Sequence, residues 1–249
     1  MSQTLAEWLR ERPFSLAMSS GFFSFFAHAG LLSALLEARL VAVRVSGSSA
    51  GALVTAAWAG GVEPDELAAE LFQLERKHFW DPGLGAGLLR GALFQQRLDK
   101  MLGGKTFERA RVPAALSVFE LKTRRTQVIE SGAISTAIRA SCAVPGLFHP
   151  VDIDGRLYWD GGVLDRPGLA GMPAGERVLY HHILSQSPWR IGGAGMGIPS
   201  RDNMTTLAMS HLPRSGPFRL EHGRRAYDVA RALARKALAV EVRNARVVV

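Results

Sequence analysis

The sequence predicts an α/β fold with a mostly parallel central sheet that is covered on both faces. Two short apolar segments, residues 14–18 and 40–45, have the composition of buried strands, and an apolar helical segment follows each, at 27–38 and 50–58. Strand–helix units with short connections are typical of parallel sheets. The 249 residues, 47% of them hydrophobic, are enough for a sizeable core. Because no linker or repeat interrupts the pattern, we expect one domain over residues 1–249.

The N-terminal third begins with a predicted polar helix over residues 4–12, which Pro13 ends. Residues 14–36 contain no Asp, Glu, Lys or Arg, so a transmembrane segment or a signal peptide is an alternative. We reject it because serines and His28 interrupt the stretch, and its glycines lie where a strand, a loop and a helix would meet. The expected location is therefore cytoplasmic, with peripheral contact to a membrane left open.

The remaining elements follow from periodicity and turn signals. Residues 64–77 and 93–102 are expected to form helices, separated by a glycine-rich loop at 81–91. Further elements are predicted in chain order: strands at 114–120 and 126–129, a helix at 134–141, a hairpin of 151–153 and 157–159, and a strand at 177–183. Residues 185–203, rich in Gly, Pro and Ser, are expected to form a mobile surface segment. The chain closes with a basic helix over about 223–240 and a β-branched tail.

Charge and cysteine content exclude several classes of protein. The net charge of +8 favours anionic partners, but no basic motif interleaved with aromatic residues indicates binding to nucleic acid. The single cysteine, Cys142, excludes a disulfide framework and a cysteine-rich zinc site, and we expect it to be a core residue. No metal-ligand pattern is visible, so we expect no metal and no cofactor. The oligomeric state cannot be read from the sequence.

The C-terminal helix combines an apolar face with many basic residues. The apolar face would dock on the rest of the domain, through Ala230, Leu233, Ala234, Ala237 and Leu238. Basic residues occur throughout this region, at Arg224, Arg225, Arg231, Arg235, Lys236, Arg243 and Arg246. We interpret them as a solvated face, with contact to an anionic membrane surface as the alternative.

Residues 46–51 read Ser-Gly-Ser-Ser-Ala-Gly and follow the predicted strand at 40–45. A serine on a sharp strand-to-helix turn projects its hydroxyl away from the sheet, with a helix N-terminus behind it. Glycine at positions 47 and 51 avoids side chains that would crowd such a turn. An isolated G-x-S-x-G match is weak evidence, but the strand before it and the helix after it make Ser49 a candidate nucleophile.

A serine nucleophile needs a base and donors for an oxyanion, and two other segments are candidates for these roles. Asp160 precedes Gly161 and Gly162, which let the backbone approach another loop closely, so its carboxylate could reach Ser49 directly. The alternative is an ordinary turn aspartate. The loop at 19–23 connects the first strand to its helix and places amides near the anion-binding helix terminus. Its alternative is a plain strand–helix connection.

Together these segments resemble the patatin-like phospholipase family over roughly residues 14–170. Block 16–36 resembles the family's glycine-rich oxyanion segment, and 47–51 matches its nucleophile elbow. Residues 140–148, Ala-Ser-Cys-Ala-Val-Pro-Gly-Leu-Phe, are similar to its A-S-x-A-x-P-G-x-F segment, and 160–162 match its D-G-G motif. The order of the four blocks, rather than any one of them, carries the resemblance.

The resemblance implies a three-layer α/β/α fold and a cofactor-independent serine hydrolase that cleaves lipid acyl esters through an acyl-enzyme. It implies Ser49 as nucleophile and Asp160 as general base, in a dyad without histidine. Where the family has G-G-G-x-[RK]-G, this chain has Ser-Gly-Phe-Phe-Ser-Phe at 20–25, although the backbone amides of Gly21 and Phe22 can still form an oxyanion hole. Loss of the cation leaves the headgroup open, so the expected substrate is a lipid acyl ester in general.

Two other functions remain open at this stage. The altered loop is compatible with a catalytically weakened relative that binds lipids or membranes without turnover. His181 and His182, on the predicted strand at 177–183, could complete the Ser-His-Asp triad of an α/β-hydrolase, although such enzymes place more strands before the elbow. His28, near the start of an apolar helix, is expected to pack under the oxyanion loop.

Overall fold

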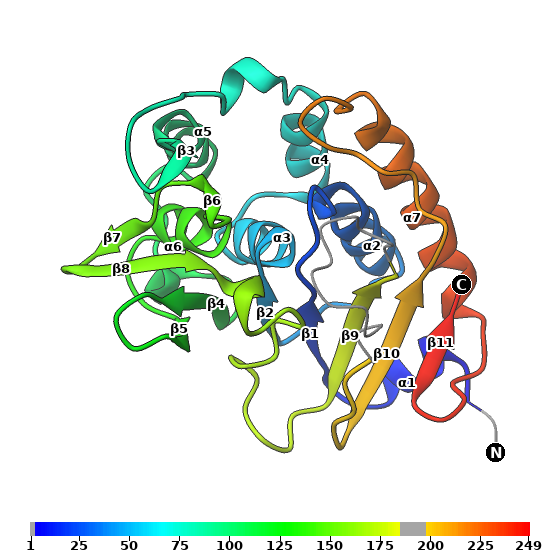
Figure 1. Cartoon of the computed structure of the whole chain (residues 1–249). Helices are drawn as coiled ribbons and strands as arrows, with labels where there is room; N and C mark the ends of the chain where they lie inside the picture. Colours follow the sequence, from blue (N-terminus) through cyan, green and yellow to red (C-terminus); the bar gives the residue numbers. More distant parts are fainter. Residues whose placement is uncertain (1–2, 185–197) are drawn as a thin grey trace.

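The computed structural model describes residues 3–184 and 198–249, whose main feature is a central sheet. Its strands are β1 (Ser15–Met18), β2 (Arg44–Ser48), β4 (Ala114–Glu120), β5 (Arg125–Ile129), β7 (Val151–Ile153), β8 (Arg156–Asp160), β9 (Val178–Ile183), β10 (Met204–Met209) and β11 (Arg246–Val248). Within the described residues these nine strands are ordered β11-β10-β9-β1-β2-β4-β8-β7, with β5 also paired to β4 (Figure 1). The strands from β11 to β4 are parallel, whereas β5, β7 and β8 run antiparallel to their neighbours. The predicted α/β class with a mostly parallel sheet is confirmed.

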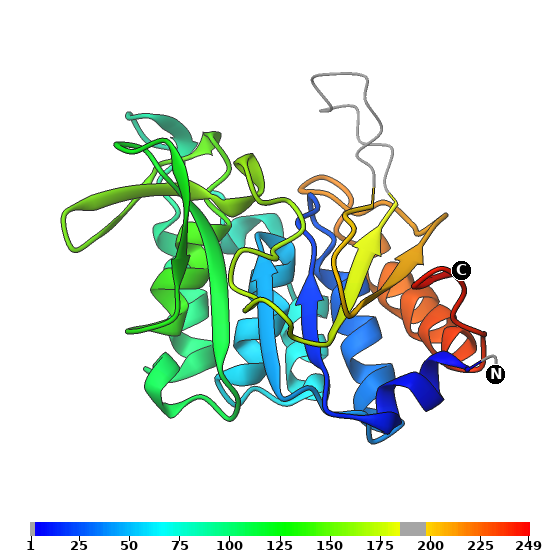
Figure 2. The same cartoon turned by 90° about the horizontal axis from the view of Figure 1, so that it is seen from below.

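Helices pack against one face of this sheet. The α-helices are α1 (Leu5–Glu11), α2 (Phe25–Glu37), α3 (Ala50–Ala59), α4 (Pro64–Phe72), α5 (Ala92–Leu102), α6 (Ile134–Ser141) and α7 (His222–Leu238), and the 3-10 helices are η1 (Arg76–His78), η2 (Phe107–Arg109) and η3 (Gly161–Val163). Helices α2, α3, α6 and α7 lie behind the strands in Figure 2 and share the main hydrophobic core with them. The opposite face of β2 and β4 is covered by residues 164–176, which are irregular in backbone.

The second strand begins four residues later than the predicted start at 40. Val41 and Val43 are β-branched but exposed, whereas Ser46 and Gly47 pair with β1. The covering segment passes close to this strand, since a Cβ on Gly168 would lie 2.7 Å from the Ser48 nitrogen. Close packing across the sheet, rather than local β propensity, therefore decides where β2 lies.

Other differences from the prediction involve short elements. The helix predicted at 64–77 ends at residue 72, and η1 follows it. The loop predicted at 81–91 contains β3 (Gly87–Leu89), which pairs with β6 (Gly146–Phe148) in a separate small sheet. Strand β10 was not predicted, because it follows directly on the segment interpreted as mobile; residues 185–197 of that segment lie outside the described residues.

The uncharged stretch at 14–36 forms a strand, a loop and a helix, as predicted. Helix α2 begins at Phe25, slightly before the predicted start at 27, and every residue from 26 to 35 is buried. Its apolar character therefore reflects a buried position in the core. No helix in the part of the chain that the structure describes is both long and apolar enough to cross a bilayer.

Helix α7 spans the predicted basic helix, and several of its basic side chains are engaged within the protein. Its predicted apolar face is buried at Ala230, Ala234 and Ala237. Arg231 and Arg235 both form ion pairs with Glu37 of α2, and the Arg224 guanidinium lies 4.1 Å from the centroid of the Phe72 ring. These contacts dock α7 on α2 and α4.

Candidate active site

Ser49 lies at the sharp turn between β2 and α3. Its backbone angles, φ 51° and ψ −116°, are uncommon for a non-glycine residue and are typical of a strained strand-to-helix elbow. A Cβ on Gly47 would lie 2.5 Å from the carbonyl carbon of Gly51, and one on Gly51 would overlap the carbonyl oxygen of Met18. Glycine at these two positions therefore lets β1, β2 and α3 approach closely around the serine.

The carboxylate of Asp160 lies in direct contact with Ser49, which is 111 residues away in the chain. Ser49 Oγ donates a hydrogen bond to Asp160 Oδ2 at 2.6 Å, and the Gly162 amide donates to Oδ1 at 2.7 Å. The Asp160 amide donates to the Ala143 carbonyl at 2.9 Å, which fixes the end of β8. The β7–β8 hairpin thus carries the carboxylate to the elbow and holds both of its oxygens.

Burial raises the pKa of Asp160 from 3.8 to about 6, because water is largely excluded from its charged form. The hydrogen bonds from Ser49 and Gly162 oppose this rise, since they favour the carboxylate. The residue is only 5% exposed. At pH 7 to 8 the carboxylate is ionised, yet it binds a proton more strongly than an ordinary aspartate does.

The loop before α2 presents free backbone amides beside Ser49. Gly21 and Phe22 line the same pocket as the serine, and within residues 3–184 and 198–249 neither amide donates to a protein acceptor. The start of the loop is fixed, since the Ser19 amide donates to the His181 carbonyl and the Ser20 amide donates to the Arg166 carbonyl. This arrangement offers donors for a developing negative charge without a prior partner to displace.

Ser141 supports the elbow from helix α6, a role that the sequence analysis missed. The Ser49 amide donates to Ser141 Oγ at 2.9 Å, and Ser141 Oγ donates to the Ser117 carbonyl at 2.7 Å. Cys142 Sγ lies 3.2 Å from the Ser49 carbonyl, and burial raises the pKa of its thiol. The position of Ser141 in the block at 140–148 was the only signal in the sequence.

Replacement of Ser141 by alanine is expected to loosen the elbow and, in an assay of the ester hydrolysis expected from the sequence, to lower kcat about tenfold with little change in KM. The Ser49 amide would lose its acceptor, which costs about 1–3 kcal/mol of stability and loosens the elbow. Steady-state kinetics and urea unfolding measure the two effects. Ser135→Ala is the matched control, because Ser135 is also buried on α6 but accepts from Gln95 instead. An equal loss of kcat in both variants would contradict the assigned contact.

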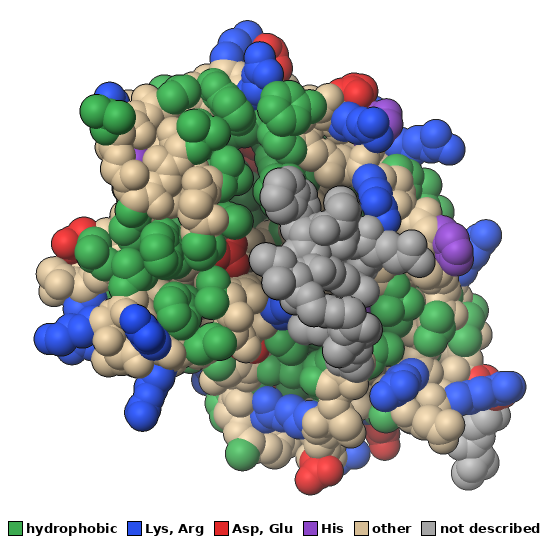
Figure 3. All heavy atoms as spheres, in the orientation of Figure 1, with side chains coloured by type: hydrophobic (Ala, Val, Ile, Leu, Met, Phe, Trp, Pro, Cys, Tyr) green, Lys and Arg blue, Asp and Glu red, His purple; other side chains and the backbone are tan. Residues whose placement is uncertain are grey.

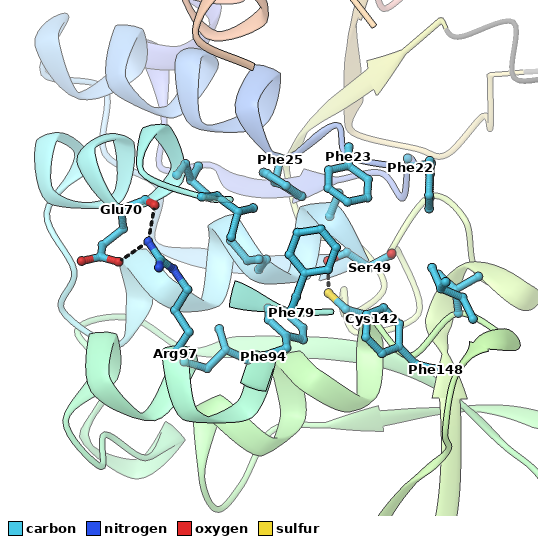
Figure 4. Close-up of a pocket in the computed structure, with 18 of the residues that line it drawn as sticks. Phe22, Phe23, Phe25, Ser49, Glu70, Phe79, Phe94, Arg97, Cys142 and Phe148 are labelled. Carbon is cyan, nitrogen blue, oxygen red and sulfur yellow. Dashed lines mark hydrogen bonds and ion pairs between the residues drawn. The ribbon is translucent and has the colours of Figure 1, made fainter. Parts of the chain in front are cut away.

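An apolar pocket, partly open to solvent, begins at Ser49 (Figure 4). Ser49 and Phe22 lie at one side of it, and Glu70 and Arg97 lie at the other. Most of the wall between them is aliphatic or aromatic, from Phe23, Phe25, Leu53, Leu71, Leu74, Phe79, Phe94, Leu98, Met101, Val144, Leu147 and Phe148. A pocket of this composition suits a hydrocarbon chain whose polar end lies at the serine.

The three histidines considered in the sequence analysis are all buried, and two of them, His28 and His181, contact each other next to Ser19. His28 Nε2 donates to the Ser19 carbonyl at 2.8 Å, so in the neutral ring Nδ1 is an acceptor, and it takes the Nδ1–H of His181, also at 2.8 Å. His182 Nδ1 lies 2.9 Å from the Tyr180 hydroxyl. Burial lowers the pKa of His28 to about 3 and that of His181 well below its ordinary value. No imidazole lies between Ser49 and Asp160, because these two side chains touch directly.

The face shown in Figure 3 carries hydrophobic side chains over the region that Figure 1 labels β3, β6 and β7, with Lys and Arg around the edge. Exposed apolar residues there include Leu84 and Leu88, and exposed Phe22 lines the pocket beside Ser49. Among the described residues, no cluster of three or more His, Cys, Asp or Glu is suited to hold a metal ion. The site therefore consists of a serine, a carboxylate, free amides and an apolar pocket.

The fold and the site define a class: α/β proteins in which a serine at a strand-to-helix elbow meets a buried carboxylate. The family model described as Patatin-like phospholipase matches residues 16–171, close to the predicted range of 14–170. The chain belongs to the patatin-like phospholipase family. The resemblance to this family that the sequence motifs indicated is thereby confirmed.

Individual relatives agree with this assignment. An uncharacterized NTE family protein of Mycobacterium tuberculosis is 34% identical over 208 residues, which are 81% of this chain and 56% of that protein. The chain therefore spans little more than half the length of this relative. Lysophospholipase NTE1 of Phaeosphaeria nodorum is 26% identical over 71% of this chain and 12% of its own length. The crystal structure of VipD from Legionella pneumophila has the same fold, with a TM-score of 0.63 at 15% identity, over 91% of this chain and 66% of that one.

Proposed function

We propose that the protein hydrolyses lipid acyl esters through a Ser49–Asp160 dyad. The observation that carries the proposal is the 2.6 Å hydrogen bond from Ser49 Oγ to Asp160 Oδ2 at the mouth of an apolar pocket. A serine hydroxyl is a weak nucleophile until a base removes its proton, and the raised pKa of Asp160 suits a carboxylate to that task. Membership of the patatin-like phospholipase family supports the same reaction class.

In the proposed first half-reaction, Ser49 Oγ attacks the ester carbonyl carbon while its proton moves to Asp160 Oδ2. The carbonyl oxygen becomes an oxyanion and accepts hydrogen bonds from the amides of Gly21 and Phe22. The tetrahedral intermediate collapses with cleavage of the bond to the alcohol oxygen, and Asp160 returns the proton to that oxygen. The alcohol leaves, and the acyl group stays on Ser49.

In the second half-reaction a water molecule attacks the acyl-serine, and Asp160 accepts its proton. Collapse of the second tetrahedral intermediate releases the carboxylic acid, and Ser49 Oγ recovers the proton. The sum of both steps is one ester and one water converted to one acid and one alcohol. The composition of the pocket favours an acyl chain as the group that remains on the serine.

The substrate is proposed as a lipid ester without assignment of its headgroup. One relative is named a lysophospholipase, which supports glycerophospholipids with a single acyl chain as the first substrates to try. The loop at 20–25 lacks the cation of the family motif, so a neutral glyceride belongs in the same panel. The exposed apolar residues near β3 support contact with a lipid surface during turnover.

Hydrolysis of short-chain p-nitrophenyl esters, together with labelling by a fluorophosphonate probe, tests the proposal. The dyad predicts turnover by the wild-type protein and covalent labelling of Ser49. Absence of both in a folded sample would favour the alternative function, a relative that binds lipid without turnover. Loss of turnover in His181→Gln or His182→Gln, with the fold intact, would instead favour a histidine triad.

The dyad also predicts how activity depends on pH. Because Asp160 must be ionised to act as a base, kcat/KM is expected to fall about tenfold per pH unit below pH 6 and to be level by about pH 8. A soluble ester measured from pH 4.5 to 8.5 gives the profile. A profile that follows a different group and is abolished by His181→Gln would contradict the assignment of the base.

A further inference from the structure

The far side of the apolar pocket is formed by an ion pair that joins two helices. Glu70 lies on α4 and Arg97 on α5, and in Figure 4 both lie across the pocket from Ser49. Arg97 Nη2 donates to Glu70 Oε2 at 2.9 Å and to the Glu70 carbonyl at 2.7 Å. Arg97 Nη1 also lies 3.2 Å from His78 Nδ1 of η1. The Arg97 guanidinium thus connects α5, which carries it, to α4 and to η1.

The ion pair lies between an apolar interior and solvent. The side chains of Arg97 and Glu70 are 22% and 33% exposed, so one side of the pair faces water and the other faces the pocket. Leu71, Leu74 and Leu98 line the pocket on the same helices or directly after them. A hydrocarbon chain that extends from Ser49 across the pocket therefore contacts charged side chains only when it is long enough to reach this pair.

We propose that the Glu70–Arg97 pair limits the length of the acyl chain that the enzyme accepts. This inference rests on the proposed function, since it identifies the substrate preference of the same site. Each methylene placed in the apolar part gains burial, whereas a chain too long for the pocket must separate the two charges and desolvate them. The pair bridges α4 and α5 at the distal end of the pocket.

A series of p-nitrophenyl esters from four to sixteen carbons tests the inference. In the wild-type protein, kcat/KM is expected to rise up to about fourfold per added methylene, equivalent to ~0.8 kcal/mol, and then to fall beyond a limiting length. In the double variant Glu70→Ala/Arg97→Ala, which leaves no unpaired charge behind, that limit is expected to move about two carbons or more to longer chains. The limit is read relative to each variant's own activity on the shortest ester, so a general loss of activity does not count as a shift.

Three further variants make the result specific. Arg97→Lys retains a long charged side chain opposite Glu70, so its limit should stay near that of the wild type. Leu74→Phe adds volume to the pocket wall and should move the limit to shorter chains. The matched control is Glu63→Ala/Arg111→Ala, which removes another Arg–Glu pair, with a separation of 2.8 Å, whose residues do not line the pocket.

Measurement of fatty-acid binding to a catalytically inactive variant tests this inference separately from the proposed function. In a Ser49→Ala background, displacement of a fluorescent fatty acid by saturated fatty acids of six to eighteen carbons should show the same limit and the same shifts. If no ester is hydrolysed but the binding limit moves as expected, the proposed function fails and the pocket assignment survives. If Glu70→Ala/Arg97→Ala and Leu74→Phe are folded and both retain the wild-type limit, the inference is overturned.

Discussion

Ser49→Ala and Asp160→Asn are each expected to lower kcat/KM for a short-chain ester by about 10⁴-fold. Ser49→Ala removes the attacking oxygen, and Asp160→Asn removes the proton acceptor while it keeps the size of the side chain. Because the two residues act as one unit, the double variant should be little worse than either single variant. Steady-state kinetics with an active-site titration measure these losses. Loss in Ser49→Ala together with full activity in Asp160→Asn would contradict the dyad.

Asp160→Asn should at the same time raise the free energy of unfolding. A loss of activity in this variant would therefore not result from a loss of fold. The pKa of Asp160 is about 6 in the folded protein and near 3.8 in the unfolded chain, so its contribution to stability is present below pH 3.8 and is lost as the pH rises through about 6. At pH 8 the asparagine avoids that cost, with an expected gain of about 1–3 kcal/mol. Urea unfolding at pH 8 and pH 4 should show the gain only at the higher pH.

The second large effect is a loss of stability in acid that arises from the buried histidines. Burial holds the pKa of His28 near 3 when the protein is folded, whereas the unfolded chain has a value near 6.5. The unfolded state therefore binds a proton first, and stability is lost as the pH falls from about 6.5 toward 3. Between pH 7 and pH 4.5, His28 alone is expected to remove about 2–3 kcal/mol from the free energy of unfolding.

His28→Gln isolates this contribution, because an amide can donate to the Ser19 carbonyl and accept from His181 without titration in this range. The variant should be less stable than the wild type at pH 7 but should lose about 2–3 kcal/mol less between pH 7 and pH 4.5. His211→Gln, at an exposed histidine, is the control and should follow the wild type. Equal slopes in wild type and His28→Gln would show that His28 does not carry the effect.

Much of the fold and the central contact of the site could be predicted from the sequence. The glycines at 47 and 51 mark an elbow because only a residue without a side chain fits there, and the D-G-G motif at 160–162 marks a close backbone approach for the same reason. Such requirements are local and therefore visible in the sequence. The start of β2 could not be found this way, because it depends on a segment more than 120 residues later that packs across the strand.

The distal half of the site was hidden for a similar physical reason. Glu70 and Arg97 lie on separate amphipathic helices, and each alone is typical of a solvated helix face. Only the packing of α4 and α5 around the pocket brings them together. Ser141 was also hidden, since a small polar residue at the end of a helix has no distinctive pattern until its partner, the Ser49 amide, is known.

The two side chains of the proposed dyad belong to parts of the sheet with different architecture. Ser49 follows a strand of the parallel centre, whereas Asp160 is the last residue of an antiparallel arm at its margin. A single substitution at the end of that arm would remove the proposed base without disturbing the parallel strands. On the proposed mechanism, loss of the Asp160 carboxylate alone would leave a protein that holds an acyl chain in the same pocket without cleaving it.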